Sequence, residues 1–298
     1  MDFLRDHREA LLYSIPLTSA LFAAEVAFRG WKKSTGFRLL FDRNDSSRMD
    51  LLLATLNIMH WTAPLAALLS FGAGEAINRW SQAHIRVSLT DFLPPGLARG
   101  VTAFVVADLA WYWKHRLEHR CTPLWRIYEV HHSATEMNWI TGHRLHPLDF
   151  AVEQAVLSVP YALIGVSFGS FLVFRVFSLL HSFLVHGPFD WGFGRFGDSL
   201  LLSPRSHRVH HSTLPEHLNR NFCGIFPVWD RLFGTAYGGE ASPVLPLQVN
   251  GTSRVEPIRT LAAAYFGFWT SRIPGLESRL RFPSALLRKE TSARIERA

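Results

Sequence analysis

The sequence contains 15 histidines, and several of them stand at spacings that suit metal binding. His115 and His119 in "HRLEH" are four residues apart, so on a helix both imidazoles project from one face. His207, His210 and His211 in "HRVHH" take positions i, i+3 and i+4, which also share a helical face. Imidazole is a ligand for zinc, iron, copper and nickel alike. The spacing therefore predicts a metal site built on helices.

Two further groups extend this pattern. His131 and His132 follow Tyr128 in "YEVHH", and "HSFLVH" runs from His181 to His186. Together the groups give eight candidate metal ligands, which are His115, His119, His131, His132, His186, His207, His210 and His211. Eight imidazoles are too many for one ion and enough for two, so we predict two metal ions.

The ligand types also bear on which metal binds. A structural zinc site needs four ligands and usually recruits cysteine, whereas an all-histidine set with open positions favours a redox metal that binds O2. We therefore expect two iron ions. The pair of Glu-x-x-His motifs that soluble di-iron bundles use is not evident in the chain, and neither is the HExxH motif of a zinc-dependent hydrolase.

Long apolar stretches indicate a membrane protein. Leu51 to Gly74 contains no Asp, Glu, Lys or Arg over 24 residues, and Gln154 to Phe174 contains none over 21, which are lengths that cross a bilayer as helices. Ala10 to Phe28 and Leu97 to Trp113 are weaker spans. The segment from Phe150 to His186 is interrupted by one proline and two glycines, and so predicts a tight hairpin of two short helices. The total is about five membrane segments.

The distribution of basic residues predicts the orientation. The loop between the first two spans carries Arg29, Lys32, Lys33, Arg38, Arg43 and Arg48, whereas residues 75–96 offer only Arg79 and Arg86. The positive-inside rule then places the first loop, and with it the histidines, in the cytosol. The N-terminus lacks a small-residue cleavage pattern, so we expect the first helix to be retained. A bacterial inner membrane and an endoplasmic reticulum membrane both suit this multi-pass topology.

The expected fold is all-α, a polytopic membrane helical bundle with a cytosolic, histidine-rich helical cap. We divide the chain into N-terminal membrane helices at 1–96, a catalytic domain at 97–240 and a C-terminal cytosolic tail at 241–298. Cys121 and Cys223 lie in the predicted cytosolic regions, where a disulfide is not expected, and are assigned to the core. The net charge of +7 is dispersed, which favours anionic lipid head groups over nucleic acid as its partner.

Six segments closely resemble the fatty acid hydroxylase and sterol desaturase superfamily of membrane di-iron enzymes, over roughly residues 100 to 238. They are Asp108 with "WYWKHRLEH", "LWRIYEVHHS", "HRLHPLDF", "FLVHG", "SPRSHRVHHS" and "NFCGIFPVWDRLFGT". The resemblance implies two irons that activate O2 and electrons from a cytochrome b5-like or ferredoxin-type partner. It also implies a membrane lipid substrate in which an unactivated C–H bond is hydroxylated or desaturated, chemistry that requires a metal cofactor.

Three positions depart from the family pattern. Tyr128 stands where the second box, HxxHH, has its first histidine; Asp149 replaces a usual Glu; and Pro188 replaces a usual Asn. A phenolate can bind iron, but the ordinary tyrosine pKa of about 10 makes this a poor default. His143 is the natural substitute for the absent imidazole. The alternative function is a degenerate family member that binds lipid or acts as a scaffold, because Tyr128 breaks the box.

Several other residues are expected to support the ligands. Metal-binding histidines generally need hydrogen-bond partners that orient them. Asp108 and Asn221 either fill this role or make ordinary cap and polar contacts, and we assign His146 and His181 to the same supporting layer. "WDRLFGT", residues 229–235, is expected to be a structural turn. The identity of the lipid, the position of attack, and the choice between hydroxylation and desaturation stay open.

Overall fold

A computed structural model describes residues 3–41, 45–94, 96–165, 168–239 and 257–271. Within these ranges the regular elements are helices, which confirms the all-α prediction. The first five α-helices are α1 (Phe3–Arg29), α2 (Thr35–Phe41), α3 (Asp45–Ile58), α4 (Thr62–Leu69) and α5 (Ala73–His84). The next four are α6 (Leu97–Arg120), α7 (Thr122–His132), α8 (Pro147–Ile164) and α9 (Phe168–His186). The last four are α10 (Gly194–Leu200), α11 (Pro204–His211), α12 (Val228–Leu232) and α13 (Pro257–Thr270).

Short 3-10 helices connect these elements, and one of them, η3 (Trp139–His143), matters below. The others are η1 (Trp31–Lys33), η2 (Leu89–Phe92) and η4 (Pro215–His217).

Three helices around the histidines have well-defined starts. Each of α7, α8 and α11 has a proline in its first turn, where the ring fixes φ near the helical value and no amide hydrogen is lost from the helix. The Ser203 hydroxyl caps α11 by accepting a hydrogen bond from the Ser206 amide at 3.3 Å. The His146 imidazole caps α8 in the same way through the Leu148 amide at 3.0 Å. The first of these caps fixes where His207, His210 and His211 lie along α11.

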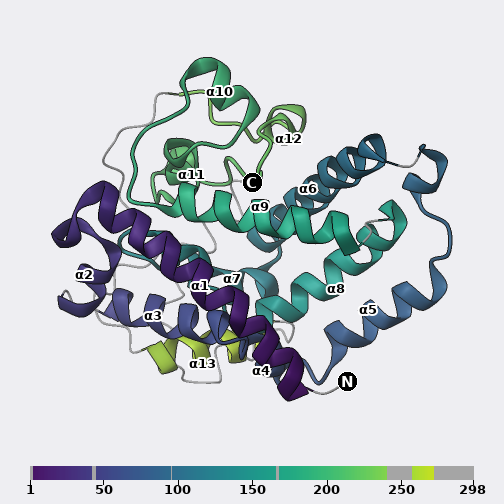
Figure 1. Cartoon of the computed structure of the whole chain (residues 1–298), viewed down its shortest axis with the longest axis horizontal. Helices are drawn as coiled ribbons and strands as arrows, with labels where there is room; N and C mark the ends of the chain where they lie inside the picture. Colours follow the sequence, from purple (N-terminus) through teal and green to yellow (C-terminus); the bar gives the residue numbers. More distant parts are fainter. Residues whose placement is uncertain (1–2, 42–44, 95, 166–167, 240–256, 272–298) are drawn as a thin grey trace.

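The helices share one central packing region. The core cluster around Ile127 of α7 takes Ala66 from α4, Leu148 and Ala151 from α8, and Phe268 from α13. Helices from all three predicted segments, 1–96, 97–240 and 241–298, therefore surround the same core. In Figure 1, α10, α11 and α12 lie together above α9, while α1, α3 and α13 lie below it. The described part of the predicted tail is thus a helix packed on α7 and α3.

The predicted membrane spans stay a prediction. Within the described ranges, no single helix is both long and apolar enough to cross a bilayer, and only Ser46–Ile58 with Thr62–Leu69 pass that test as a pair. The pair is bent by 96°, so Leu51 to Gly74 is not the one straight helix that its composition predicted. The bend falls at His60, which has a positive φ of 57° and interrupts the helical hydrogen bonding.

The predicted hairpin is present as α8 and α9, which confirms two helices in residues 150–186. Helix α8 ends at Gly165, whose φ of 81° is open to glycine at little cost. Pro160 lies inside α8 and does not break it. The number of membrane segments, about five, stays a prediction.

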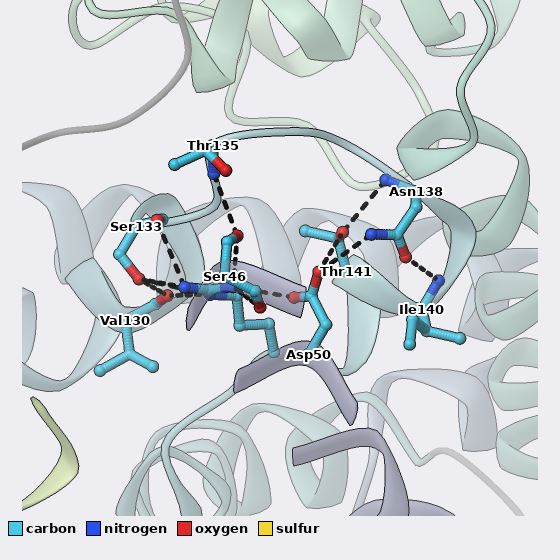
Figure 2. Close-up of polar contacts among 9 residues, drawn as sticks. Ser46, Asp50, Val130, Ser133, Thr135, Asn138, Ile140 and Thr141 are labelled. Carbon is cyan, nitrogen blue, oxygen red and sulfur yellow. Dashed lines mark hydrogen bonds and ion pairs between the residues drawn. The ribbon is translucent and has the colours of Figure 1, made fainter. Parts of the chain in front are cut away.

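A buried polar network fastens α3 to the end of α7 (Figure 2). Arg144 lies at its centre and donates hydrogen bonds to the Val130 carbonyl at 3.0 Å and to the Ser133 hydroxyl at 2.9 Å. Its Nη1 donates to Asp50 Oδ1 at 3.0 Å. Asp50 Oδ2 accepts from Asn138 Nδ2 at 2.9 Å. The network joins the N-terminal helices to the residues that follow His131 and His132.

Replacing Asp50 by Ala should destabilise the fold strongly. The Arg144 and Asp50 side chains are 4% and 1% exposed, and removing one partner of a buried ion pair costs about 3–5 kcal/mol. Thermal unfolding of the purified protein measures the loss. The matched control is Glu75→Ala, which removes the exposed Arg79–Glu75 pair and should cost less than about 1 kcal/mol. Equal falls in the melting temperature of both variants would contradict this role for Asp50.

Candidate metal centre

All eight candidate ligands come together in two groups of four. One group holds His115, His119, His132 and His210, and the other holds His131, His186, His207 and His211. Within each group, one ring nitrogen of every histidine lies within 4.8 Å of the others. Metal–imidazole bonds are about 2.0–2.1 Å long, so donors on opposite sides of one ion lie about 4 Å apart. The spread of each group is therefore close to that of a single coordination sphere.

Four helices deliver these side chains, and the neighbouring pairs divide between the groups. Successive residues point about 100° apart around a helix axis. His131 and His132 of α7 therefore turn to different groups, as do His210 and His211 of α11. Helix α6 supplies two ligands to the first group and α9 supplies one to the second. The two groups are contiguous, because the His132 and His211 rings stack with their centres 4.4 Å apart.

Backbone carbonyls orient three of the imidazoles. His115 Nδ1 lies 2.8 Å from the Phe222 carbonyl, His210 Nδ1 lies 2.9 Å from that of Arg220, and His186 Nδ1 lies 2.8 Å from that of Ser182. A carbonyl oxygen only accepts, so each Nδ1 carries the proton and donates it. The Nε2 lone pair of each ring is left for a metal ion, as in most histidine-metal sites.

The remaining nitrogens fit metal binding better than hydrogen bonding. In the described part of the chain, His115 Nε2 and both nitrogens of His132 are buried without a hydrogen-bond partner. In the second group the Nε2 atoms face one another: His186 lies 3.3 Å from His131 and 2.9 Å from His207, and His207 lies 3.1 Å from His211. Converging lone pairs inside a protein are costly unless a cation binds them. The donor set thus fits two metal ions.

The electrostatics keep these imidazoles neutral. Each of the eight side chains is at most 6% exposed. Burial first, and the neighbouring histidines second, lower the pKa of His131, His132, His207 and His211 well below the ordinary value. A protonated imidazole has no lone pair for a metal. The depressed pKa values therefore keep the ligands in their binding form at neutral pH.

Tyr128 lies among the ligands but is not needed to complete either group. Its ring centre is 5.2 Å from that of His115, 5.4 Å from His119 and 5.4 Å from His131. Burial, then the charges of Glu118 and the acids of α8, raise the pKa of the Tyr128 phenol well above its ordinary value. Each group already has four histidines without the phenol, so the geometry favours Tyr128 as an aromatic wall against both groups.

The other candidate histidines lie outside the two groups. His143 packs its ring on Phe183 at 5.2 Å, so the structure does not bring it into the place of the absent imidazole. His146 places Nε2 3.2 Å from the Leu261 carbonyl of α13, in addition to capping α8. His181 places Nε2 2.9 Å from the Leu202 carbonyl. The last two therefore hold helices and loops in position.

Asp108 and Asn221 support the loop that follows α11. Asp108 accepts hydrogen bonds from the amides of Ile225 and Phe226, both at 3.1 Å, and from Trp229 Nε1 at 2.9 Å. Asn221 donates to the Ser206 carbonyl at 3.0 Å. These bonds hold the loop in place, and the loop contains the Phe222 and Arg220 carbonyls that orient His115 and His210.

Asp230, in the predicted structural turn, completes this support. It accepts from the Phe222 amide at 2.7 Å, the Cys223 amide at 2.9 Å and the Thr235 hydroxyl at 2.7 Å. By binding the Phe222 amide, Asp230 holds in place the residue whose carbonyl orients His115. Cys223 and Cys121 are both free thiols, which confirms that they form no disulfide.

A buried ion cluster beside Tyr128 had no counterpart in the sequence analysis. Lys114 Nζ lies 2.7 Å from Glu118 Oε1 and 3.3 Å from Asp149 Oδ2, and all three side chains are at most 1% exposed. Lys114 Nζ also lies 5.5 Å from the Tyr128 ring centre. Burial and Asp149 raise the pKa of Glu118 well above its ordinary value. Lys114 and Glu118 each adjoin a candidate ligand in sequence, and this proximity is the one signal that could have revealed them.

Together these features define a helical protein with two contiguous four-histidine sites inside its core. Residues 100–235 match the family model described as fatty acid hydroxylase. This part of the chain is similar to the fatty acid hydroxylase superfamily, which its histidine segments also resemble.

Similar proteins include several lipid-modifying enzymes. Human alkylglycerol monooxygenase is 29% identical over 170 residues, which cover 57% of this chain and 37% of the human protein. The Danio rerio alkylglycerol monooxygenase is 34% identical over 133 residues, 45% of this chain and 29% of that protein. Ornithine lipid hydroxylase OlsE of Rhizobium tropici is 32% identical over 135 residues, 45% of this chain and 40% of that protein. The matches thus span less than half the length of these relatives. No solved structure matches the chain.

Tyr128→Phe should leave metal binding intact. The variant keeps the aromatic ring and removes only the hydroxyl, which the eight histidines make unnecessary as a ligand. Metal analysis of the variant should give the wild-type metal content. The oxidised wild-type protein should show no phenolate-to-iron absorption band, so the two absorption spectra should agree. A visible band in the wild-type protein that disappears in Tyr128→Phe together with metal would instead identify Tyr128 as a ligand.

Proposed function

We propose that this protein is a membrane-bound, two-iron hydroxylase of a lipid. The observation that carries the proposal is the pair of contiguous groups of four buried, neutral histidines in a chain that is similar to the fatty acid hydroxylase superfamily. His115, His119, His132 and His210 would hold one ion, and His131, His186, His207 and His211 the other. Iron bound there would supply the activation of O2 that protein side chains cannot provide.

The residues of the chain have three tasks in this reaction. The imidazoles stay neutral and bind, since protonation would release the ions. The carbonyls of Phe222, Arg220 and Ser182 hold the protons of three Nδ1 atoms and so fix the ring orientations. The rings of Tyr128 and Phe222 line the first group; Phe222 lies 5.1 Å from His119. These rings exclude water from the ligands.

The relatives favour hydroxylation over desaturation. Two of them are named alkylglycerol monooxygenase and a third is named ornithine lipid hydroxylase. Both names describe insertion of oxygen into a lipid. We extend this to the present chain as a lipid hydroxylase that takes O2 and external electrons, supplied by a cytochrome b5-like or ferredoxin-type protein. The apolar stretches and the basic first loop support a multi-pass location with the histidines on the cytosolic side.

The rival is a degenerate family member that binds lipid without catalysis. It rests on Tyr128, which breaks the second histidine box. Against it, the two groups contain four histidines each without any contribution from position 128. The enzyme is therefore the better supported function.

Iron content is the first test of this function. Protein purified in mild detergent under anaerobic, reducing conditions should bind about two iron ions per chain. His132→Ala removes a ligand whose two nitrogens are otherwise unpaired and should lower the metal content and abolish turnover. His84→Ala is the matched control, because His84 is exposed on α5, outside both groups. Zinc at full occupancy after iron-supplemented growth would argue against the redox assignment.

The product is the second test. Lipids from cells that express the wild-type protein should contain a species that is heavier by one oxygen, 16 mass units, than a lipid of cells without it. The His132→Ala strain should lack that species, and the His84→Ala strain should retain it. A product lighter by two hydrogens would assign desaturation, and an unchanged lipid profile with fully loaded iron would support the scaffold function.

A further inference from the structure

A long groove between α6 and α8 is not part of the metal centre. Its volume is about 690 Å³, within the usual range for a small-molecule site. Nine of its twelve lining residues are apolar, among them Leu109 and Trp113 of α6 and Pro160 and Leu163 of α8. Trp113 is 47% exposed and Leu163 is 52% exposed, so the groove opens at the protein surface. An open apolar groove of this size is suited to a hydrocarbon chain.

The charges in the groove lie at one end. Its three charged lining residues are Lys114, Arg116 and Arg120, all in the last two turns of α6. Arg116 and Arg120 are four residues apart and share a helical face, and Arg120 is exposed. Arg116 donates a hydrogen bond to the Tyr112 hydroxyl at 2.9 Å and lies 5.3 Å from the Trp113 ring centre. These contacts keep its guanidinium at the rim of the groove.

The dimensions match a lipid. The lining of α6 runs from Val106 to Arg120, and this part of a helix is about 21 Å long at 1.5 Å per residue. One leaflet of a bilayer has a hydrocarbon thickness of about 15 Å, half of the core. The apolar end at Val106 and Ile164 can therefore take the end of an acyl chain while a head group lies at the arginines. Two guanidinium groups favour phosphate, which they bind through paired hydrogen bonds.

The groove does not lead to the histidines. Trp113 and Leu117 line it, and each is two residues from His115, so they lie about 160° around the α6 axis from that ligand. Lys114 closes the inner side, where its buried contacts with Glu118 and Asp149 fill the junction of α6 and α8. A lipid in the groove is thus held on the face of α6 opposite to the ligands.

We propose that this groove binds a membrane phospholipid with an anionic head group, which the protein holds and does not oxidise. One acyl chain lies between α6 and α8, and the phosphate is bound by Arg116 and Arg120. The lipid then joins α6, which carries His115 and His119, to α8 over a stretch where the helices are otherwise open to the outside. The proposal rests on the membrane location given under the proposed function.

The test uses the full chain, purified in mild detergent and stripped of lipid. Dioleoyl phosphatidylglycerol, dioleoyl phosphatidylcholine and inorganic phosphate are titrated separately, with bound lipid read by native mass spectrometry and stability by the melting temperature. We expect one tightly retained phosphatidylglycerol and a higher melting temperature, weaker binding of phosphatidylcholine and no effect of phosphate. Arg116→Gln with Arg120→Gln should weaken phosphatidylglycerol binding about tenfold or more, because two cations near the head group are lost.

Two matched variants make the result specific. Arg79→Gln with Arg86→Gln removes the same charge from exposed positions outside the groove and should bind phosphatidylglycerol as the wild type does. Leu163→Trp fills the apolar groove and should weaken phosphatidylglycerol and phosphatidylcholine alike, with helicity checked by circular dichroism. Equal binding by the wild type and the Arg116/Arg120 variant, or a similar response to phosphate alone, would overturn the proposal.

Metal and product measurements on the same samples separate this proposal from the enzyme assignment. The Arg116/Arg120 variant should keep its iron, since neither residue belongs to the histidine groups. Absence of iron and of oxidised lipid, with selective phosphatidylglycerol binding intact, would remove the proposed function and leave the lipid site. Oxidation of the added phosphatidylglycerol would show that the groove lipid is a substrate, and the site as proposed here would be wrong.

Discussion

The crowding of eight imidazoles into one buried volume is the constraint on which the rest of the structure depends. Two of these rings stack at 4.4 Å and others bring their Nε2 atoms within 3.3 Å of one another. Such packing is tolerable only while the rings are neutral, because several buried like charges at these distances would repel strongly. Neutral rings with inward lone pairs in turn attract cations. Burial therefore both permits the cluster and suits it to bind cations.

Fixed ring orientations follow from that constraint, and much of the remaining polar structure serves it. Three Nδ1 atoms donate to carbonyls of a loop or of a preceding helical turn. The loop that carries two of these carbonyls is held by Asp108 and Asp230 through backbone amides. On the other side, Arg144 donates hydrogen bonds to the carbonyls of Val130 and Ser133, which flank the histidine pair of α7. Asp108, Asp230 and Arg144 thus stabilise backbone that carries or orients the histidines, which is the role expected of outer hydrogen bonds around a metal.

The sequence was sufficient to select the eight histidines that cluster, and insufficient to predict how they divide into two groups. Helical spacing places His115 with His119 and predicts eight donors for two ions, but spacing cannot tell which ion receives each donor. The division of adjacent histidines, such as His131 and His132, depends on how α6, α7, α9 and α11 are placed around the two groups. His143 was a plausible substitute by its position in the sequence, yet η3 directs it to Phe183. The bend at His60 was missed because composition alone carries no information on backbone dihedrals.

Tyr128 shows how a box can lose one imidazole and keep its geometry. Each group already offers four histidine nitrogens to its metal ion. A ninth imidazole at position 128 is therefore not needed to give either ion four ligands. A phenol of raised pKa in that place adds no charge, and its ring packs against His115, His119, His131 and His132. The Lys114 ammonium lies 5.5 Å from the centre of the same ring, and an aromatic ring attracts such a cation. Tyr128 therefore contacts both the histidine groups and the buried ion cluster as a neutral aromatic side chain.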